Sequence, residues 1–136
     1  MSENEYKKGA KINVSKHFVS SEFDCPCNAC TVTLVQPDLV SKLENLRVAI
    51  NQPLKISSGY RCESYQLELK LRGFETAKGI SQHQLGAAAD LLCEGMTGES
   101  LEHFARQAGF TSVGVGHSFI HVDLRPGNRR WTYAKR

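Results

Sequence analysis

Ser57-Ser58-Gly59-Tyr60-Arg61 is followed along the chain by Ser81-Gln82-His83, by Asp90 and by His121-Val122-Asp123. Together these segments supply two imidazoles, carboxylates and an arginine that can hold a carboxylate. A catalytic zinc ion usually takes three protein ligands and keeps a fourth position for water. The sequence therefore predicts that His83, Asp90 and His121 form a zinc site with one open position.

The neighbouring residues indicate where these side chains lie in the fold. Gly86 and the three alanines after it separate His83 from Asp90, which favours a loop for the histidine and a buried strand that begins at the aspartate. His121 and Asp123 alternate with apolar residues, so on a strand both side chains lie on one face. We therefore expect the site to lie on a sheet.

A larger set of residues resembles a known family. Phe23 and Cys25, the Ser-Gly-Tyr-Arg turn, the run from Ser81 to Asp90 and the His-Val-Asp strand follow the order found in the zinc D-alanyl-D-alanine carboxypeptidases. Relatives of these enzymes include the vancomycin-resistance D,D-dipeptidases, phage endolysins and the Hedgehog signalling domain. The resemblance extends from about residue 17 to residue 131, which is nearly the whole chain.

The resemblance implies a zinc metallopeptidase that hydrolyses peptidoglycan stem peptides, either as a D-Ala-D-Ala carboxypeptidase or as an endolysin-type L-Ala-D-Glu endopeptidase. The implied fold is α+β, with a small antiparallel sheet and flanking helices, as in the Hedgehog domain and the D,D-peptidases. The residues that match the family's motifs are His83, Asp90 and His121 as metal ligands, and Arg61 and Ser81 as substrate contacts.

The general base of many relatives has no direct counterpart. They carry a glutamate or aspartate three residues before the last histidine, where this chain has Ser118. Asp123 is one substitute, and its alternative role is to fix the ring of His121 through a hydrogen bond. His117 is another substitute if the strand runs through it to His121. The missing acid also favours a different function, a zinc-stabilised module that binds the wall or a partner without cleaving it.

Length and composition fit a small wall enzyme. With 136 residues the chain suits one domain, in which residues 1–12 form a loose polar tail. No run approaches the roughly 20 apolar residues of a membrane span, and the polar, acidic start lacks the features of a secretory signal. We therefore expect a protein that stays in the cytoplasm until release, as a phage-encoded enzyme acting on the bacterial wall would.

Basic residues are concentrated at the C-terminal end. The formal net charge is only +3, yet the last residues contain five basic side chains and no acid, namely Arg125, Arg129, Arg130, Lys135 and Arg136. With Trp131 and Tyr133 between them, they suit an anionic polymer such as nucleic acid or cell wall. A solvated tail with one aromatic ring on the core is the simpler interpretation, so nucleic acid is not the expected partner.

The chain has five cysteines, which are Cys25, Cys27, Cys30, Cys62 and Cys93. An odd number cannot all pair within one chain, and the absence of an export signal favours the reduced state. Cys25, Cys27 and Cys30 are close enough for a structural metal or a local disulfide, but a closed zinc site needs a fourth ligand. Cys62 and His17 are candidates for that ligand, and buried free thiols are the alternative to a metal site.

The predicted elements run in an α+β order, with most helices before a small antiparallel sheet. Pro37 and Thr97 mark two helix starts, and Gly73 and Gly109 mark two helix ends. The elements are a short helix from about residue 20, a helix from 37 to before Pro53, a strand over 54–56, a helix over 63–71, a helix from 97 to 109, and strands over 112–115 and 119–124.

Overall fold

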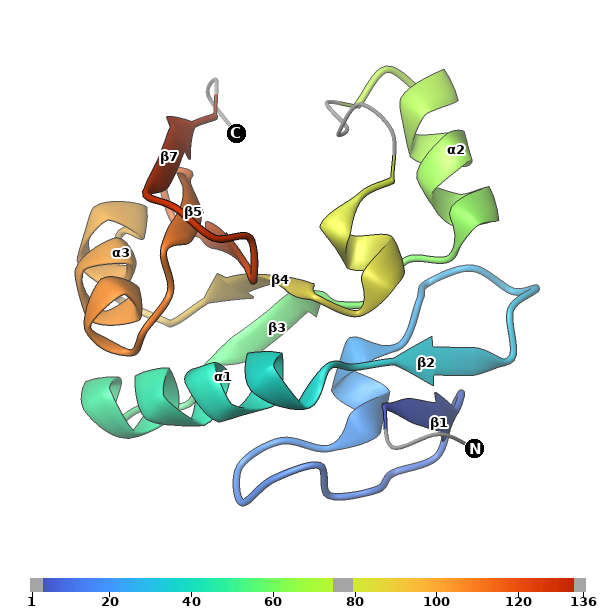
Figure 1. The fold of residues 1–136 in the computed structure, drawn as a ribbon, viewed down its shortest axis with the longest axis horizontal. Coiled ribbons are helices and arrows are strands. Elements are labelled where there is room, and N and C mark those ends of the chain that lie inside the picture. The colour runs from blue at the N-terminus through green and yellow to red at the C-terminus, as the bar shows by residue number, and fades with distance from the viewer. Residues whose placement is uncertain (1–3, 75–79, 134–136) are drawn as a thin grey trace.

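The computed structural model describes residues 4–74 and 80–133, and its main element within these residues is a five-stranded sheet (Figure 1). The strand order is β3-β4-β6-β5-β7. Every pair is antiparallel except β5 with β7. The α+β prediction is confirmed, with a parallel pair at one edge as an added feature. The strands are β3 Lys55–Ser58, β4 Ala88–Leu92, β5 Ser112–Val115, β6 Ile120–Asp123 and β7 Arg129–Thr132.

A second, two-stranded sheet corrects the prediction of a loose tail over residues 1–12. Strand β1 (Glu5–Lys7) pairs antiparallel with β2 (Val32–Leu34), and Tyr6 packs against the core. The prediction is wrong for these residues because the partner strand satisfies their backbone N–H and C=O groups, which a polar sequence alone does not reveal. Residues 1–3 lie outside the described part. The short helix expected near residue 20 is the 3₁₀ helix η1 (Ser20–Phe23).

Helix α1 (Pro37–Ile50) confirms the predicted amphipathic helix. Pro37 occupies the first helical turn, where a missing N–H costs nothing. Asn51 ends the helix in the left-handed region at φ 51°, and its N–H bonds the Arg47 carbonyl at 3.1 Å. The buried side of the helix follows the three-to-four spacing and consists of Leu39, Val40, Leu43, Leu46 and Ile50.

Two further helices also follow their sequence signals. Helix α2 spans Glu63–Leu71, as predicted, and α3 spans Gly98–Gln107. Thr97 caps α3, because its side-chain oxygen accepts the Ser100 N–H at 3.1 Å. Helices α1 and α3 contact one another, and α3 lies against β5 and β6. Both helices therefore cover the core side of the sheet, while α2 lies apart from them near the other end of the molecule (Figure 1).

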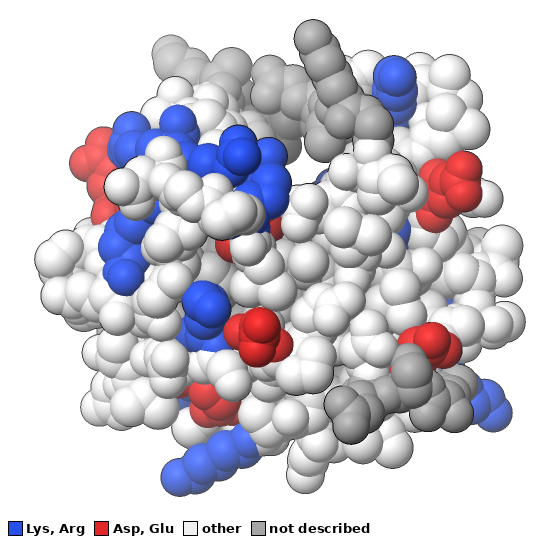
Figure 2. All heavy atoms as spheres, viewed as in Figure 1, with Lys and Arg blue, Asp and Glu red and all other residues white. Residues whose placement is uncertain are grey.

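Residues 129–132 of the C-terminal basic segment form a strand, β7, and not the solvated tail of the simpler interpretation. Arg129–Thr132 pair with β5 as its parallel edge partner, and Trp131 is partly buried. Arg130 pairs with Glu102 at 2.9 Å. Basic side chains nevertheless gather on the surface over β7 and the loop before it (Figure 2). Lys135 and Arg136 lie outside the described residues.

None of the described helices combines the length and the apolar character needed to cross a membrane.

Candidate metal centre

Two neighbouring central strands carry Asp90 and His121 side by side. The register of β4 against β6 pairs Asp90 directly with His121. Asp90 lies in the middle of its strand, two residues after the start at Ala88, and not at the beginning as predicted. Ala88 and Ala89 are almost fully buried, so small side chains allow this strand to run through the interior. The predicted placement of the site on a sheet is confirmed for these two residues.

His83 reaches the same place from a tight turn, the 3₁₀ helix η2 (Gln82–Leu85). Ser81 caps this turn, because its hydroxyl oxygen accepts the His83 N–H at 3.2 Å. Gly86 ends it in the left-handed region at φ 68°. A Cβ atom at position 86 would lie 2.5 Å from the carbonyl oxygen of Leu34, so only glycine fits this return of the chain.

The side chains of His83, Asp90 and His121 converge on one point. Asp90 Oδ1 lies 3.4 Å from His83 Nε2 and 3.0 Å from His121 Nδ1. One ligand atom from each residue lies within 4.8 Å of the other two. Metal–ligand bonds of about 2.0–2.1 Å in a tetrahedron separate the ligand atoms by roughly 3.3 Å. The three predicted ligands therefore have the spacing of one face of a tetrahedral metal site.

The outer nitrogen of each imidazole is held by a protein acceptor. His83 Nδ1 lies 2.7 Å from the carbonyl oxygen of Gly59, which can only accept, so this nitrogen donates. His121 Nε2 lies 2.8 Å from the Asp123 carboxylate. These contacts leave His83 Nε2 and His121 Nδ1 as the nitrogens that face Asp90. Histidine ligands of metals are commonly fixed in this way.

The electrostatics of the three groups are strongly coupled. Burial opposes ionisation of Asp90, but hydrogen bonds from His121 and His83 outweigh it and hold the pKa of this carboxyl far below its usual range. Burial lowers the pKa of His83 below its ordinary value. Burial also opposes the charged form of His121, yet its bonds to Asp123 and Asp90 raise its pKa. A cation at this point would therefore meet an ionised carboxylate between two imidazoles.

The two predicted substrate contacts lie at this centre. Arg61 Nη2 bonds Asp90 Oδ2 at 3.0 Å, and its Nε bonds the Ser58 hydroxyl at 2.9 Å. A guanidinium group has five N–H donors, so these two bonds leave others for a ligand. The side chains of Arg61 and Asp90 remain 17% and 18% exposed. Ser81 is buried, and its observed role is to cap the turn that carries His83.

The structure separates the two candidates for the general base. Asp123 is buried and accepts four bonds, from His121 Nε2 and from the backbone N–H, Nε and Nη2 of Arg125. Burial opposes its ionisation, but these bonds hold its pKa far below the usual range, which makes it a weak proton acceptor. This geometry fits the role of fixing the His121 ring.

The condition for His117 is not met. Strand β5 ends at Val115 and β6 begins at Ile120, so the strand does not run through residue 117. His117 is exposed in the turn between the strands, as is Ser118. His117 therefore does not share a strand face with His121, because the hairpin turn occupies these positions.

Sequence reasoning did not identify two groups that shape the centre. One is the Gly59 carbonyl, which no side-chain pattern can reveal. The other is Arg125, which binds Asp123 and lies over the Trp131 ring at 5.3 Å. The alternation of the extended segment after His121 could have placed Arg125 on the same face as His121 and Asp123.

The chain belongs to the peptidase M15 family, whose model matches residues 16–123. The match confirms the family resemblance seen in the sequence. A solved structure, the L-Ala D-Glu endopeptidase ChiX of Serratia marcescens, is similar with 23% sequence identity, a TM-score of 0.49, and coverage of 67% of this chain and 80% of that one. No curated protein matches the chain.

Proposed function

We propose that this member of the peptidase M15 family is a zinc-dependent peptidase that hydrolyses the stem peptides of bacterial peptidoglycan. The observation that carries the proposal is the convergence of His83 Nε2, Asp90 Oδ1 and His121 Nδ1, with the outer nitrogen of each ring already bonded. Two imidazoles and one carboxylate suit zinc and leave one position open. Family membership supports cleavage of peptide bonds, and the resemblance to D-Ala-D-Ala carboxypeptidases supports the wall substrate.

The residues around the metal centre would bind the substrate and orient the two histidine rings. Zinc, when bound, supplies a water of lowered pKa and polarises the scissile carbonyl. Arg61 presents free N–H donors beside the ligands and would bind a substrate carboxylate or carbonyl. Ser81 and Gly59 hold His83, and Asp123 holds His121, so both rings are oriented before substrate arrives.

The test is mass spectrometry of defined stem peptides after incubation with the zinc-loaded protein. We expect one cleaved bond, and the fragment masses distinguish loss of a terminal D-alanine from an internal cut between L-alanine and D-glutamate. His83→Ala should abolish cleavage, because it removes one of three ligands. His103→Ala, which changes a histidine on the surface of α3, should cleave like the unaltered protein. Equal cleavage by His83→Ala would refute the proposal.

A second candidate function is a zinc-stabilised binding module without peptidase activity. Two observations favour it, the serine at position 118 and the saturation of Asp123 by four hydrogen bonds. A binding module would retain zinc and bind stem peptides without producing fragments. Zinc content measured on the same sample as cleavage therefore separates the two functions.

A further inference from the structure

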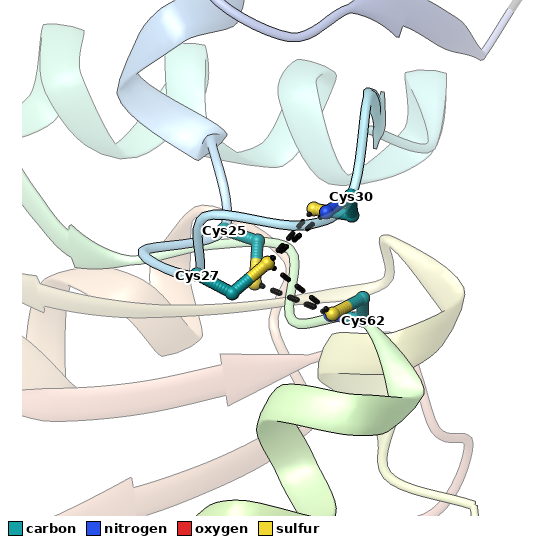
Figure 3. A group of neighbouring side chains, drawn as sticks. All are labelled: Cys25, Cys27, Cys30 and Cys62. Carbon is teal, nitrogen blue, oxygen red and sulfur yellow. Dashed lines mark hydrogen bonds between the residues drawn. The ribbon is translucent and has the colours of Figure 1, made fainter.

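Four of the five cysteines lie together, although one of them is far from the others in sequence (Figure 3). Cys25, Cys27 and Cys30 lie on the loop after η1, and Cys62 precedes the first turn of α2. The sulfur separations are 3.2 Å for Cys27–Cys30, 3.6 Å for Cys27–Cys62 and 3.8 Å for Cys25–Cys62. All four sulfurs lie within 4.8 Å of one another.

These separations fit a shared ion better than they fit disulfides. A tetrahedral zinc with Zn–S bonds of about 2.3 Å separates its sulfurs by roughly 3.8 Å. All five cysteines are free thiols in this structure. Cys27 and Cys30 have the two-residue spacing that is typical of structural zinc sites. Three sulfurs from one loop and one from a helix start therefore form a closed ligand set.

The surroundings stabilise negative charge on the sulfurs. The Cys30 N–H donates to Cys27 Sγ at 3.4 Å, and the Cys62 N–H donates to Cys25 Sγ at 3.5 Å. Lys8 Nζ lies 3.3 Å from Cys30 Sγ and 3.6 Å from Cys27 Sγ. Four thiolates around one zinc carry a net charge of about −2, and the Lys8 ammonium offsets part of it.

The sulfurs differ in their readiness to ionise without a metal. Backbone N–H groups of Cys30 and Ala29 lower the pKa of Cys27 to about 5. Burial raises the pKa of Cys25 to about 12. Zinc binds cysteine as the thiolate, so metal binding at these four sulfurs should release protons.

We propose that Cys25, Cys27, Cys30 and Cys62 hold a structural zinc ion that is separate from the centre of His83, Asp90 and His121. This ion would join the loop after η1 to the start of α2. The cysteine site does not depend on the proposed peptidase function, because no residue is shared between the two centres.

The cysteine site would also brace the segment that serves the other centre. Cys62 directly follows Arg61, and the preceding residues already contact η1, since the Tyr60 N–H bonds the Phe23 carbonyl at 2.9 Å. A Cβ atom on Gly59 would lie 2.7 Å from the Phe23 Cα, so the two backbones are in close contact. The zinc would therefore hold Arg61 and the Gly59 carbonyl in place from the adjacent residue. This effect on the active centre rests on the proposed function.

The experiment counts zinc by elemental mass spectrometry in reduced protein after exhaustive dialysis. We expect about two zinc ions per chain in the unaltered protein and about one in the double variant His83→Ala/His121→Ala. Cys30→Ser in that double background should lose the remaining ion. Cys93→Ser is the matched control and should keep it, because Cys93 is a buried thiol outside the cluster. A double variant that binds no zinc overturns the proposal.

A second readout covers cysteine variants that fail to fold. Co²⁺ added to the folded His83→Ala/His121→Ala protein should produce the strong near-ultraviolet absorption of thiolate-to-cobalt charge transfer, together with tetrahedral visible bands. Absence of that absorption contradicts a four-thiolate site. A lower intact mass of the protein also contradicts it, because loss of the thiol hydrogens means that disulfides have formed. A protein that holds zinc at the cysteines but cleaves no stem peptide supports this inference and refutes only the proposed peptidase function.

Discussion

At the scale of single residues, the orientation of two imidazole rings determines what the centre can bind. His121 is held between two carboxylates, with Asp90 at Nδ1 and Asp123 at Nε2. A metal at Nδ1 would retain the Asp123 contact on the other side of the ring. We therefore infer that Asp123 is a positioning residue whose effect passes through His121.

Replacement of Asp123 by asparagine tests this role. The amide is almost the same size but has no charge, so the ring loses a negatively charged hydrogen-bond acceptor while the packing is kept. We expect Asp123→Asn to weaken zinc binding by about 10–100-fold, measured by competition with a chromophoric chelator. Asp38→Asn, which changes an exposed acid in the first turn of α1, is the control. Unchanged zinc affinity would contradict the assigned role.

Glu44 gives a residue-scale prediction about pH. Burial opposes its ionisation, but bonds from the His17 ring at 2.6 Å, from the His17 N–H at 2.8 Å and from the Ser15 hydroxyl outweigh it, so its pKa lies below the ordinary value. A carboxylate with a depressed folded pKa stabilises the protein above its unfolded pKa, and this stability is lost as the pH falls through the folded pKa.

We therefore expect Glu44→Gln to lower the free energy of unfolding by about 1–2 kcal/mol at pH 7. The difference from the unaltered protein should shrink once the pH falls below about 4. Urea unfolding of both proteins across this range, each with its metals removed, measures the difference. A difference that stays constant from neutral to acid pH would show that the Glu44 charge does not contribute.

At the scale of elements, the tight turn η2 connects α2 to β4 and carries one ligand. Gly86→Ala would force a Cβ against the Leu34 carbonyl in a backbone region that alanine avoids. We expect a loss of roughly 1–3 kcal/mol in the free energy of unfolding and weaker zinc binding, because His83 would move. Gly127→Ala is the control for backbone strain alone, since Gly127 also has a positive φ of 86° but has open space around it. Equal effects of both variants on zinc affinity would contradict this account.

The elements also show which parts of the fold the sequence could predict. Helices α1 and α2 were predictable because Pro37, Gly73 and the apolar spacing are local signals. Strands β1 and β7 were not, because each is short, lies at a sheet edge and forms only through its partner, β2 or β5. An alternation of apolar and polar residues cannot identify strands this short, and in β7 all side chains except that of Trp131 are exposed.

At the scale of the whole molecule, the three side chains that converge at the candidate site were predictable, and the groups that hold them in place were not. His83, Asp90 and His121 stand in short recognisable segments, so their identity could be read before their distances were known. The role of Asp123 depends on its contact with the outer nitrogen of the His121 ring. The role of Cys62 depends on its contact with Cys27, which is far from it in sequence. Sequence spacing left both roles open because it cannot place such contacts.

Metal removal should lower the stability of the entire fold. A ligand that binds only the folded state at a free concentration 100 times its dissociation constant adds about 2.7 kcal/mol to the free energy of unfolding. If both centres bind zinc, we expect zinc to raise the free energy of unfolding of the reduced protein by roughly twice this amount. In His83→Ala/His121→Ala, zinc should raise it by about the amount for one site. Urea titrations with zinc and with a chelator measure the gain. Identical unfolding curves under both conditions would contradict the existence of either site.

Diffraction from zinc-loaded crystals at the zinc absorption edge is the most direct test of the central claim, that His83, Asp90 and His121 form one metal centre. We predict an anomalous peak about 2.0–2.2 Å from His83 Nε2, Asp90 Oδ1 and His121 Nδ1, with a fourth position free of protein atoms. A zinc-loaded crystal without a peak there, or with zinc bound by other residues of the sheet, would contradict the account.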